Sequence, residues 1–136
     1  MEKRNFTIVV DSLKGSGNTN NCVIKINCPQ SFSNKLICEV MQFSLGYPIN
    51  TDPDSSYIKL ICNGLNIIDQ YSNNNKNILT IYDNRNYRYS RNTFYCDNFN
   101  NRELNFQLIN ESDELLTINN NQFNYPWVVI IKCTEI

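Results

Sequence analysis

The chain contains no histidine, and this absence narrows the chemistry that its 136 residues can perform. Histidine is the commonest general base and the commonest metal ligand. Catalytic arrangements that pair serine or cysteine with histidine are therefore impossible within this chain. Glycine is scarce too, and KGSG (14–17) is not followed by the lysine and hydroxyl residue of a phosphate-binding loop. We therefore expect no enzyme activity, no catalytic residues, no cofactor and no metal.

Long apolar runs and an excess of either charge are also missing. No run of about 20 apolar residues is present, as a membrane-spanning helix requires, and the start, MEKRNFTIVVDSLKGSG, does not fit a signal peptide. The formal net charge is −1, whereas nucleic-acid binders normally carry a basic surplus. These features predict a protein made in the cytoplasm, with no membrane span and no nucleic-acid partner.

Six cysteines are present, but no two have the C-x-x-C spacing of redox motifs and zinc knuckles. An even number in a secreted chain would suggest disulfides, whereas cytoplasmic thiols stay reduced. Cys22 and Cys28 share strand parity with Ile24, and Cys62 shares it with Leu60. Because free cysteine behaves as a small buried hydrophobe, we interpret these residues as core thiols, with disulfides and a metal site as the alternatives.

Apolar residues recur at every second position along nearly the whole chain, which is the period of a half-buried β-strand. Twenty-five residues are asparagine, which strands disfavour and turns favour, so the asparagine clusters mark connections. The pattern predicts eight strands: NFTIVVDS (5–12), CVIKINC (22–28), KLICEVMQFSLG (35–46), YIKLICN (57–63), NILTIYD (77–83), TFYCDNF (93–99), ELNFQLIN (103–110) and PWVVIIKC (126–133). The stretch 63–77 is interpreted as a loop that could hold a short helical turn.

The predicted strand 35–46 is unusually long and changes its apolar face. Leu36 and Val40 fall on one face, whereas Phe43 and Leu45 fall on the other. A bulge or bend near Met41–Gln42 would reconcile the two halves, as happens where a strand crosses between sheets.

Alternation with one polar face is typical of antiparallel sheets that pack on each other and are wet outside. Long connections, such as the one between 110 and 126, favour Greek-key crossings over a meander. We therefore predict one domain, residues 1–136, with an all-β fold: an eight-stranded antiparallel β-sandwich of the single jelly-roll type. A closed barrel of lipocalin type and an immunoglobulin-like sandwich are the alternatives.

Carboxylates gather in TDPDSS (51–56) and in ESDELL (111–116). The first stretch lacks the glycine and the bidentate glutamate of an EF-hand, so Asp52 and Asp54 are expected in a solvated turn. Glu111, Asp113 and Glu114 are expected to be hydrated. Acid–base catalysis needs one carboxylate to be desolvated, and neither stretch predicts that.

The most distinctive local segment is DNRNYRYSRNTFY (83–95), where arginines alternate with tyrosines. Arginine and tyrosine are enriched at protein interfaces, and the same pair can stack on single-stranded bases. We interpret the segment as a candidate protein interface, with an ordinary surface loop or a nucleic-acid contact as alternatives. Its candidate contact residues are Arg85, Tyr87, Arg88, Tyr89, Arg91 and Tyr95.

The order of these segments also suggests a family. NFTIVVDS, CVIKINCP, KLICEVMQFSLGYPI and YIKLICNGL are followed by ELNFQLINESDELLTINNNQFNYPWVVIIKC. In the last segment an alternating strand (Leu104, Phe106, Leu108), a polar connection and an aromatic residue precede a final aliphatic strand, Trp127 to Ile131. This pattern resembles the small single jelly-roll capsid proteins of nucleocytoplasmic large DNA viruses (giant viruses) and their relatives.

The resemblance implies a structural protein of the virion that has no active site. Its expected partners are the major capsid protein, other capsid proteins and further copies of itself. The short chain favours a minor capsid or cement role over that of a penton-type vertex protein. A ligand-binding β-sandwich, such as a lectin-like module with sites on loops near Asp52 and Asp54, is the alternative function.

Overall fold

The computed structural model describes residues 4–27, 35–46, 57–64, 67–68, 77–83, 86, 88–99, 102–116 and 126–136. Apart from one short 3-10 helix, η1 (Ser12–Lys14), every regular element in these ranges is a β-strand. The strands are β1 (Asn5–Asp11), β2 (Ser16–Asn18), β3 (Asn21–Ile26), β4 (Lys35–Leu45), β5 (Tyr57–Asn63), β6 (Ile67–Ile68), β7 (Ile78–Asp83), β8 (Arg88–Tyr89), β9 (Thr93–Asp97), β10 (Arg102–Ile109) and β11 (Trp127–Glu135).

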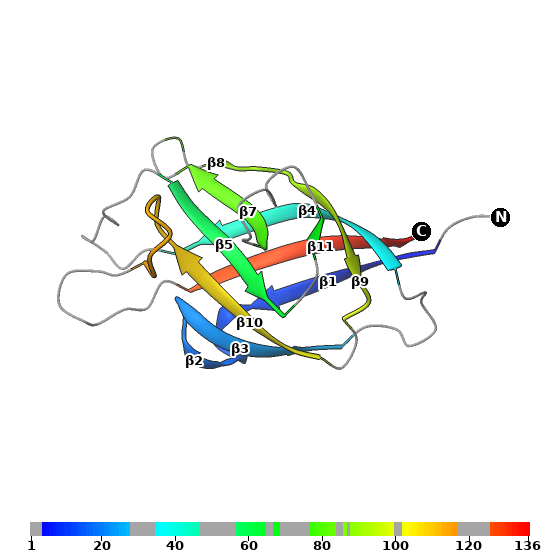
Figure 1. The fold of residues 1–136 in the computed structure, drawn as a ribbon, viewed down its shortest axis with the longest axis horizontal. Helices are drawn as coiled ribbons and strands as arrows, with labels where there is room; N and C mark the ends of the chain where they lie inside the picture. Colours follow the sequence, from blue (N-terminus) through cyan, green and yellow to red (C-terminus); the bar gives the residue numbers. More distant parts are fainter. Residues whose placement is uncertain are drawn as a thin grey trace.

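These strands form two antiparallel sheets that face each other, so the chain is an all-β sandwich (Figure 1). One sheet has five strands in the order β1-β11-β4-β9-β6. The other has six strands in the order β2-β3-β10-β5-β7-β8.

The pairing of the eight long strands is nested. The first of them, β1, pairs with the last, β11, and the second, β3, pairs with the next to last, β10. Further in, β4 pairs with β9, and β5 pairs with β7 in the middle of the chain. The layers are completed by β11 beside β4 and by β10 beside β5. A long hairpin folded over into two layers gives this order, so the sandwich is a single jelly roll.

The eight predicted strands are confirmed, each within two residues at either end. Three short strands were not predicted, so the described residues contain eleven strands where eight were expected. Each of the three, β2, β6 and β8, lies at an edge of a sheet. Strand β6 pairs with β9 at a place where the sequence suggested a helical turn. A strand of two or three residues is too short to show the alternation that reveals longer ones.

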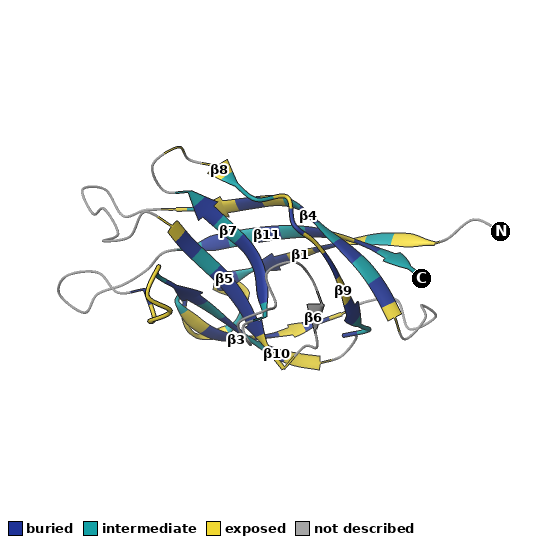
Figure 2. Ribbon diagram, turned by 45° about the horizontal axis from the view of Figure 1, so that its top comes forward, coloured by how far each residue is buried: buried dark blue, intermediate teal, exposed yellow. Residues whose placement is uncertain are grey.

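Alternate residues of both sheets point inward and form one core, seen as buried positions that recur along the strands in Figure 2. Trp127 is fully buried in it. The centroid of its ring lies 5.6 Å from that of Phe106 and 6.5 Å from that of Phe43. The indole Nε1 donates a hydrogen bond of 2.7 Å to the carbonyl oxygen of Thr19. Because its one polar atom is satisfied, burying this side chain stabilises the fold by about 3 kcal/mol.

The predicted bulge in β4 is confirmed. Opposite β11, Ile131 pairs with Val40 and Ile130 with Gln42, so Met41 is the additional residue. The inserted residue lets both Val40 and Phe43 point into the core, although their spacing is odd. β4 nevertheless stays in the five-stranded sheet, so the bulge corrects the side-chain alternation and does not carry the strand between sheets.

The described cysteines are buried free thiols, as their strand parity predicts: Cys22, Cys38, Cys62, Cys96 and Cys133. Three of them are neighbours on the core-facing side of the five-stranded sheet, where Cys38 Sγ lies 3.4 Å from Cys133 Sγ and 3.7 Å from Cys96 Sγ. The hydrogen bond that Cys38 donates to Cys133, its contact with Cys96 and burial raise the pKa of Cys38, because they favour its protonated form. The sixth cysteine, Cys28, lies outside the described residues.

Two more thiols have raised pKa values for a simpler reason. Burial raises the pKa of Cys22 to about 11 and that of Cys62 to about 12. At neutral pH both therefore stay protonated. The thiolate, which is the nucleophilic and metal-binding form, is disfavoured at these positions.

Candidate interaction surfaces

The segment 83–95, which the sequence predicts to be a contact surface, is divided between the two sheets. Arg88 and Tyr89 form β8 at the edge of the six-stranded sheet, whereas Tyr95 lies in β9 of the five-stranded sheet. Arg91 lies on the connection between them. The other two candidates, Arg85 and Tyr87, lie outside the described residues.

Asn92 fixes the point where the chain passes from one sheet to the other. Its side chain is buried, and Nδ2 donates to the carbonyl oxygens of Leu79, at 3.2 Å, and Ile78, at 3.4 Å. Its own carbonyl oxygen accepts a 2.9 Å bond from the backbone N–H of Val40 in β4. One asparagine therefore connects β7 to β4. The sequence does not predict this role of Asn92, because asparagine is abundant in the chain and is typical of loops.

Tyr89, one of the candidate contact residues, points toward the core. It is half-buried and packs against the core. Its hydroxyl donates a 2.5 Å hydrogen bond to the carbonyl oxygen of Met41, the additional residue of the β4 bulge. Tyr89 therefore joins the edge of the six-stranded sheet to the bulge in the opposite sheet, which is a structural role.

Arg91 and Tyr95 are both exposed, and each has a neighbour on β4 of the five-stranded sheet. Tyr95 is 48% exposed and stands opposite Ile37 of β4. Arg91 Nη2 lies 3.6 Å from Glu39 Oε1, and both side chains are solvent-accessible, so this ion pair contributes little to stability. We refer to Ile37, Glu39, Arg91 and Tyr95 together as the Tyr95 surface. It combines an exposed aromatic ring, an aliphatic residue and two charges of opposite sign.

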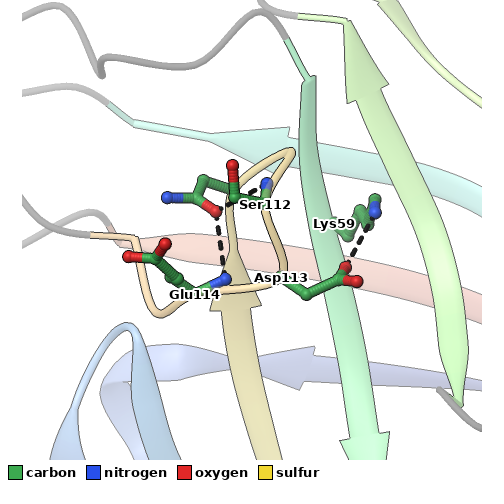
Figure 3. A network of polar contacts seen from close by, with 5 residues as sticks. Lys59, Ser112, Asp113 and Glu114 are labelled. Atoms are coloured by element: carbon green, nitrogen blue, oxygen red, sulfur yellow. Dashed lines mark hydrogen bonds and ion pairs between the residues drawn. The ribbon is translucent and has the colours of Figure 1, made fainter.

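The connection after β10 is more ordered than its acidic sequence suggests (Figure 3). Asn110 Oδ1 accepts hydrogen bonds from the backbone N–H groups of Ser112, at 2.9 Å, and Glu114, at 3.0 Å. The Asn110 N–H in turn donates to the carbonyl oxygen of Glu114 at 2.8 Å. The amide therefore closes a tight turn, in which Asp113 adopts a positive φ of 62°. Asparagine side chains commonly stabilise turns by bonding to nearby backbone.

This turn is fastened to β5. Asp113 Oδ1 lies 2.9 Å from Lys59 Nζ (Figure 3). Glu111 Oε1 accepts a 3.1 Å bond from the backbone N–H of Tyr57. Both carboxylates are exposed, as expected of hydrated acids, and each also contacts β5, because the nested strand order brings the connection beside that strand. That neighbourhood cannot be read from local sequence.

A shallow hollow of about 420 Å³ lies on the same outer side, lined by Tyr57, Lys59, Ile81 and Glu111. A void within the apolar core is far smaller, about 10 Å³. A space of that size holds at most one water molecule.

Carboxamides cover another part of the outer face of the six-stranded sheet. Asn63 Nδ2 donates to Asn105 Oδ1 at 2.9 Å, and Asn105 Nδ2 donates to Asn21 Oδ1 at 2.8 Å. Gln107 joins through a 3.2 Å bond that its Oε1 accepts from Asn63. We refer to these four residues as the amide array. It runs from β5 across β10 to β3 on an exposed face.

Two structural findings and two comparisons with known proteins bear on what these surfaces can do. Among the described residues, no three aspartate, glutamate or cysteine side chains are grouped so that they could hold a metal ion. The same part of the chain contains no helix with the length and apolarity to cross a membrane. The sequence matches no protein-family model, and a search of curated proteins finds no significant match. Fold and surface are therefore the basis for a functional proposal.

Proposed function

We propose that the chain is a structural component of the capsid of a large DNA virus, a minor capsid or cement protein that acts through protein–protein assembly and not through catalysis. The nested strand order carries this proposal, since it is the single jelly roll that the resemblance to small viral capsid proteins implies. The proposed partners are the major capsid protein, other capsid proteins and further copies of the chain. The proposed location is the virion.

The described surface suits contact better than reaction. Apolar side chains are exposed singly on the sheets, with Val9 63% and Tyr95 48% accessible. The buried thiols are held in the protonated form. A jelly roll can assemble through outer faces and sheet edges without any reactive group, because association depends on complementary shape and on a few anchoring side chains.

Among the described residues, those of the Tyr95 surface are the best candidates for the contact with other capsid proteins. Tyrosine and arginine are the residue types most enriched at binding hot spots, and here Tyr95 and Arg91 are accessible beside Ile37. Arg88, on the edge strand of the other sheet, and the sequence candidates Arg85 and Tyr87 extend the proposed contact. Tyr89 is left out of it, because its hydroxyl is bonded to Met41.

The proposal is tested by purifying virus particles from cells that produce the chain. We expect the chain to co-purify at a fixed copy ratio to the major capsid protein. Comparing that ratio with the number of vertices distinguishes a cement role from a penton-type role. Loss of the chain from particles through density gradients and salt washes would contradict a capsid function altogether.

The contact surface is tested separately with matched double variants. Arg91→Ser with Tyr95→Ser removes a cation and an exposed aromatic ring from the Tyr95 surface. The control, Lys25→Ser with Val23→Ser, removes the same kinds of group from the exposed side of β3 in the other sheet. We expect the first pair to reduce incorporation at least tenfold while the control leaves it unchanged. Equal incorporation of both would contradict the Tyr95 surface but not the capsid function.

One observation supports a second function. The amide array presents amide N–H and carbonyl groups on an exposed sheet face, and such groups can bind the hydroxyls of a sugar. A lectin-like module with this site would give a glycan-array signal that Asn105→Ala removes. The sequence candidates for loop ligands, Asp52 and Asp54, lie outside the described residues. A chelator-sensitive signal would indicate those loops, whereas a chelator-insensitive one would indicate the amide array.

A further inference from the structure

Among the strands that the structure describes, β1 is the long one with a paired neighbour on one side only. It contains seven residues and lies at the margin of the five-stranded sheet, paired with β11 on one side. The other marginal strands, β2, β6 and β8, have two or three residues each. Natural sheets usually protect their edges with very short strands, prolines or lysines. The sequence of β1, NFTIVVD, contains neither proline nor lysine.

The hydrogen-bond pattern shows which backbone groups face the open side. The N–H of Glu135 donates to the carbonyl oxygen of Arg4 at 3.0 Å. Hydrogen-bonded residues alternate along an antiparallel pair, so Phe6, Ile8 and Val10 also direct their backbone groups toward β11. Thr7 and Val9 therefore direct theirs outward. None of the described residues bonds to these outward groups.

The side chains beside this edge are arranged in two rows. Ile8 and Val10 are buried and Phe6 is half-buried on the inner side. Thr7 and Val9 are exposed on the outer side. A strand that pairs here must therefore present apolar residues inward and tolerate an uncharged, β-branched row outward.

We propose that the occupant of this edge is β1 of a second copy of the chain, paired antiparallel about a two-fold axis beside Ile8, so that two five-stranded sheets become one continuous sheet. In this register Thr7 faces Val9 of the other copy, and their outward N–H and C=O groups bond to each other. Isologous pairing of identical surfaces is the commonest way in which soluble proteins form dimers.

The side chains of β1 match those of a second β1 strand, and they match best in this register. On the inner side, Ile8 faces its own counterpart and Phe6 faces Val10, so every inner pair is apolar. At the end of the strand Asn5 faces Asp11, an amide beside a carboxylate, and no like charges meet. A shift of two residues one way places Arg4 opposite Val10, and a shift the other way places the buried Ser12 opposite Phe6. Both shifts lose an apolar pair.

The first experiment compares two substitutions at one residue. Val9→Pro removes an outward N–H that makes no bond within the described fold, and proline is tolerated at such edge positions. Val9→Ala keeps that N–H and removes most of the side chain. We expect wild-type and Val9→Ala chains to sediment as dimers and Val9→Pro chains to sediment as monomers, all with the same far-UV β-sheet spectrum. A monomeric wild type, or a dimer that survives Val9→Pro, would overturn the proposal.

The second experiment tests the register by disulfide crosslinking with diamide in a Cys28→Ser background. Because Thr7 is opposite Val9 of the other copy, a mixture of Thr7→Cys and Val9→Cys chains should crosslink, while neither variant crosslinks alone. Crosslinking of either variant with itself, or of no combination, would overturn the proposed pairing. The result concerns the chain alone, so it is independent of whether the chain resides in a capsid.

Discussion

The indole N–H of Trp127, at the start of the last strand, bonds to the carbonyl oxygen of Thr19, in the turn that leads into β3. This contact joins the two sheets near one end of the sandwich. The backbone N–H of Trp127 donates in addition to Ser12 Oγ at 2.8 Å, so the same residue also holds η1. Trp127 therefore connects three separate parts of the chain through one buried side chain and its backbone.

Replacing this side chain separates its polar contribution from its apolar one. Trp127→Phe removes the indole N–H that donates to the Thr19 carbonyl oxygen and should reduce the free energy of unfolding by about 2–3 kcal/mol, of which the lost bond supplies about 1–2 kcal/mol. Trp127→Ala should cost about 4–5 kcal/mol because a large cavity forms. Urea unfolding followed by fluorescence of the tyrosines measures both. A Trp127→Phe variant as stable as the wild type would contradict the role of the indole N–H.

The bond from Tyr89 to Met41 gives a second prediction. Tyr89→Phe removes only the hydroxyl and should lower the free energy of unfolding by about 1 kcal/mol, since the Met41 carbonyl loses its partner. Tyr95→Phe is the matched control, because that ring is exposed and none of the described residues bonds to its hydroxyl. The control should change stability by less than about 0.5 kcal/mol. Similar effects in both variants would contradict the assigned contact.

The turn at Asn110 gives a third prediction. Asn110→Ala deprives two backbone N–H groups of their acceptor and should destabilise the fold by about 1–2 kcal/mol. Glu114→Ala should be nearly neutral, since that side chain is exposed. Thermal unfolding monitored by circular dichroism separates the two outcomes. A neutral Asn110→Ala variant would show that the turn does not depend on the amide.

The buried thiols predict how stability depends on pH. In the unfolded chain a cysteine ionises near its usual pKa of about 8.5, whereas Cys62 in the folded protein has a pKa of about 12. The unfolded state therefore binds fewer protons than the folded state above pH 8.5, so the thiol's contribution is fully present below that pH and is lost as the pH rises toward 12. We expect about 2 kcal/mol of this loss by pH 10.

A Cys62→Val variant isolates this contribution from other groups that titrate at high pH. Its free energy of unfolding should fall less between pH 7 and pH 10 than that of the wild type, by about 2 kcal/mol. Urea titrations at both values measure the difference. Parallel pH profiles for the two proteins would contradict the raised pKa.

Most of the strands could be predicted because the alternation of apolar residues that marks them is a local property of the sequence. Alternation of apolar residues is a property of neighbours in the sequence, and it located all eight long strands and the bulge at Met41. The short edge strands were missed because Ile67–Ile68 or Arg88–Tyr89 are too brief to show a period. The contacts of Asn92 and Asp113 were missed for a different reason: their partners are chosen by strand order, which alternation does not specify.

The same distinction explains the outcome for the candidate surfaces. Composition singled out Arg91 and Tyr95 as candidate contact residues, and both are exposed beside β4. It could not show that Tyr89 turns inward to Met41, or that four carboxamides from three strands come together. The open edge at β1 was equally hidden, because a strand's position at a margin depends on which strand pairs with it.

The nested strand order also determines when the protein can fold. Strand β1 pairs with β11, and Arg4 and Glu135, joined by a 2.6 Å ion pair, lie 131 positions apart in the sequence, so β1 cannot pair until β11 has been synthesised. Pairings so distant along the chain close large loops and usually fold in milliseconds to seconds. Until then the nascent chain carries an unmatched apolar strand, which is a reason for it to need protection by chaperones. Labels attached beyond either strand would emerge side by side, since β1 begins next to the end of β11 (Figure 1).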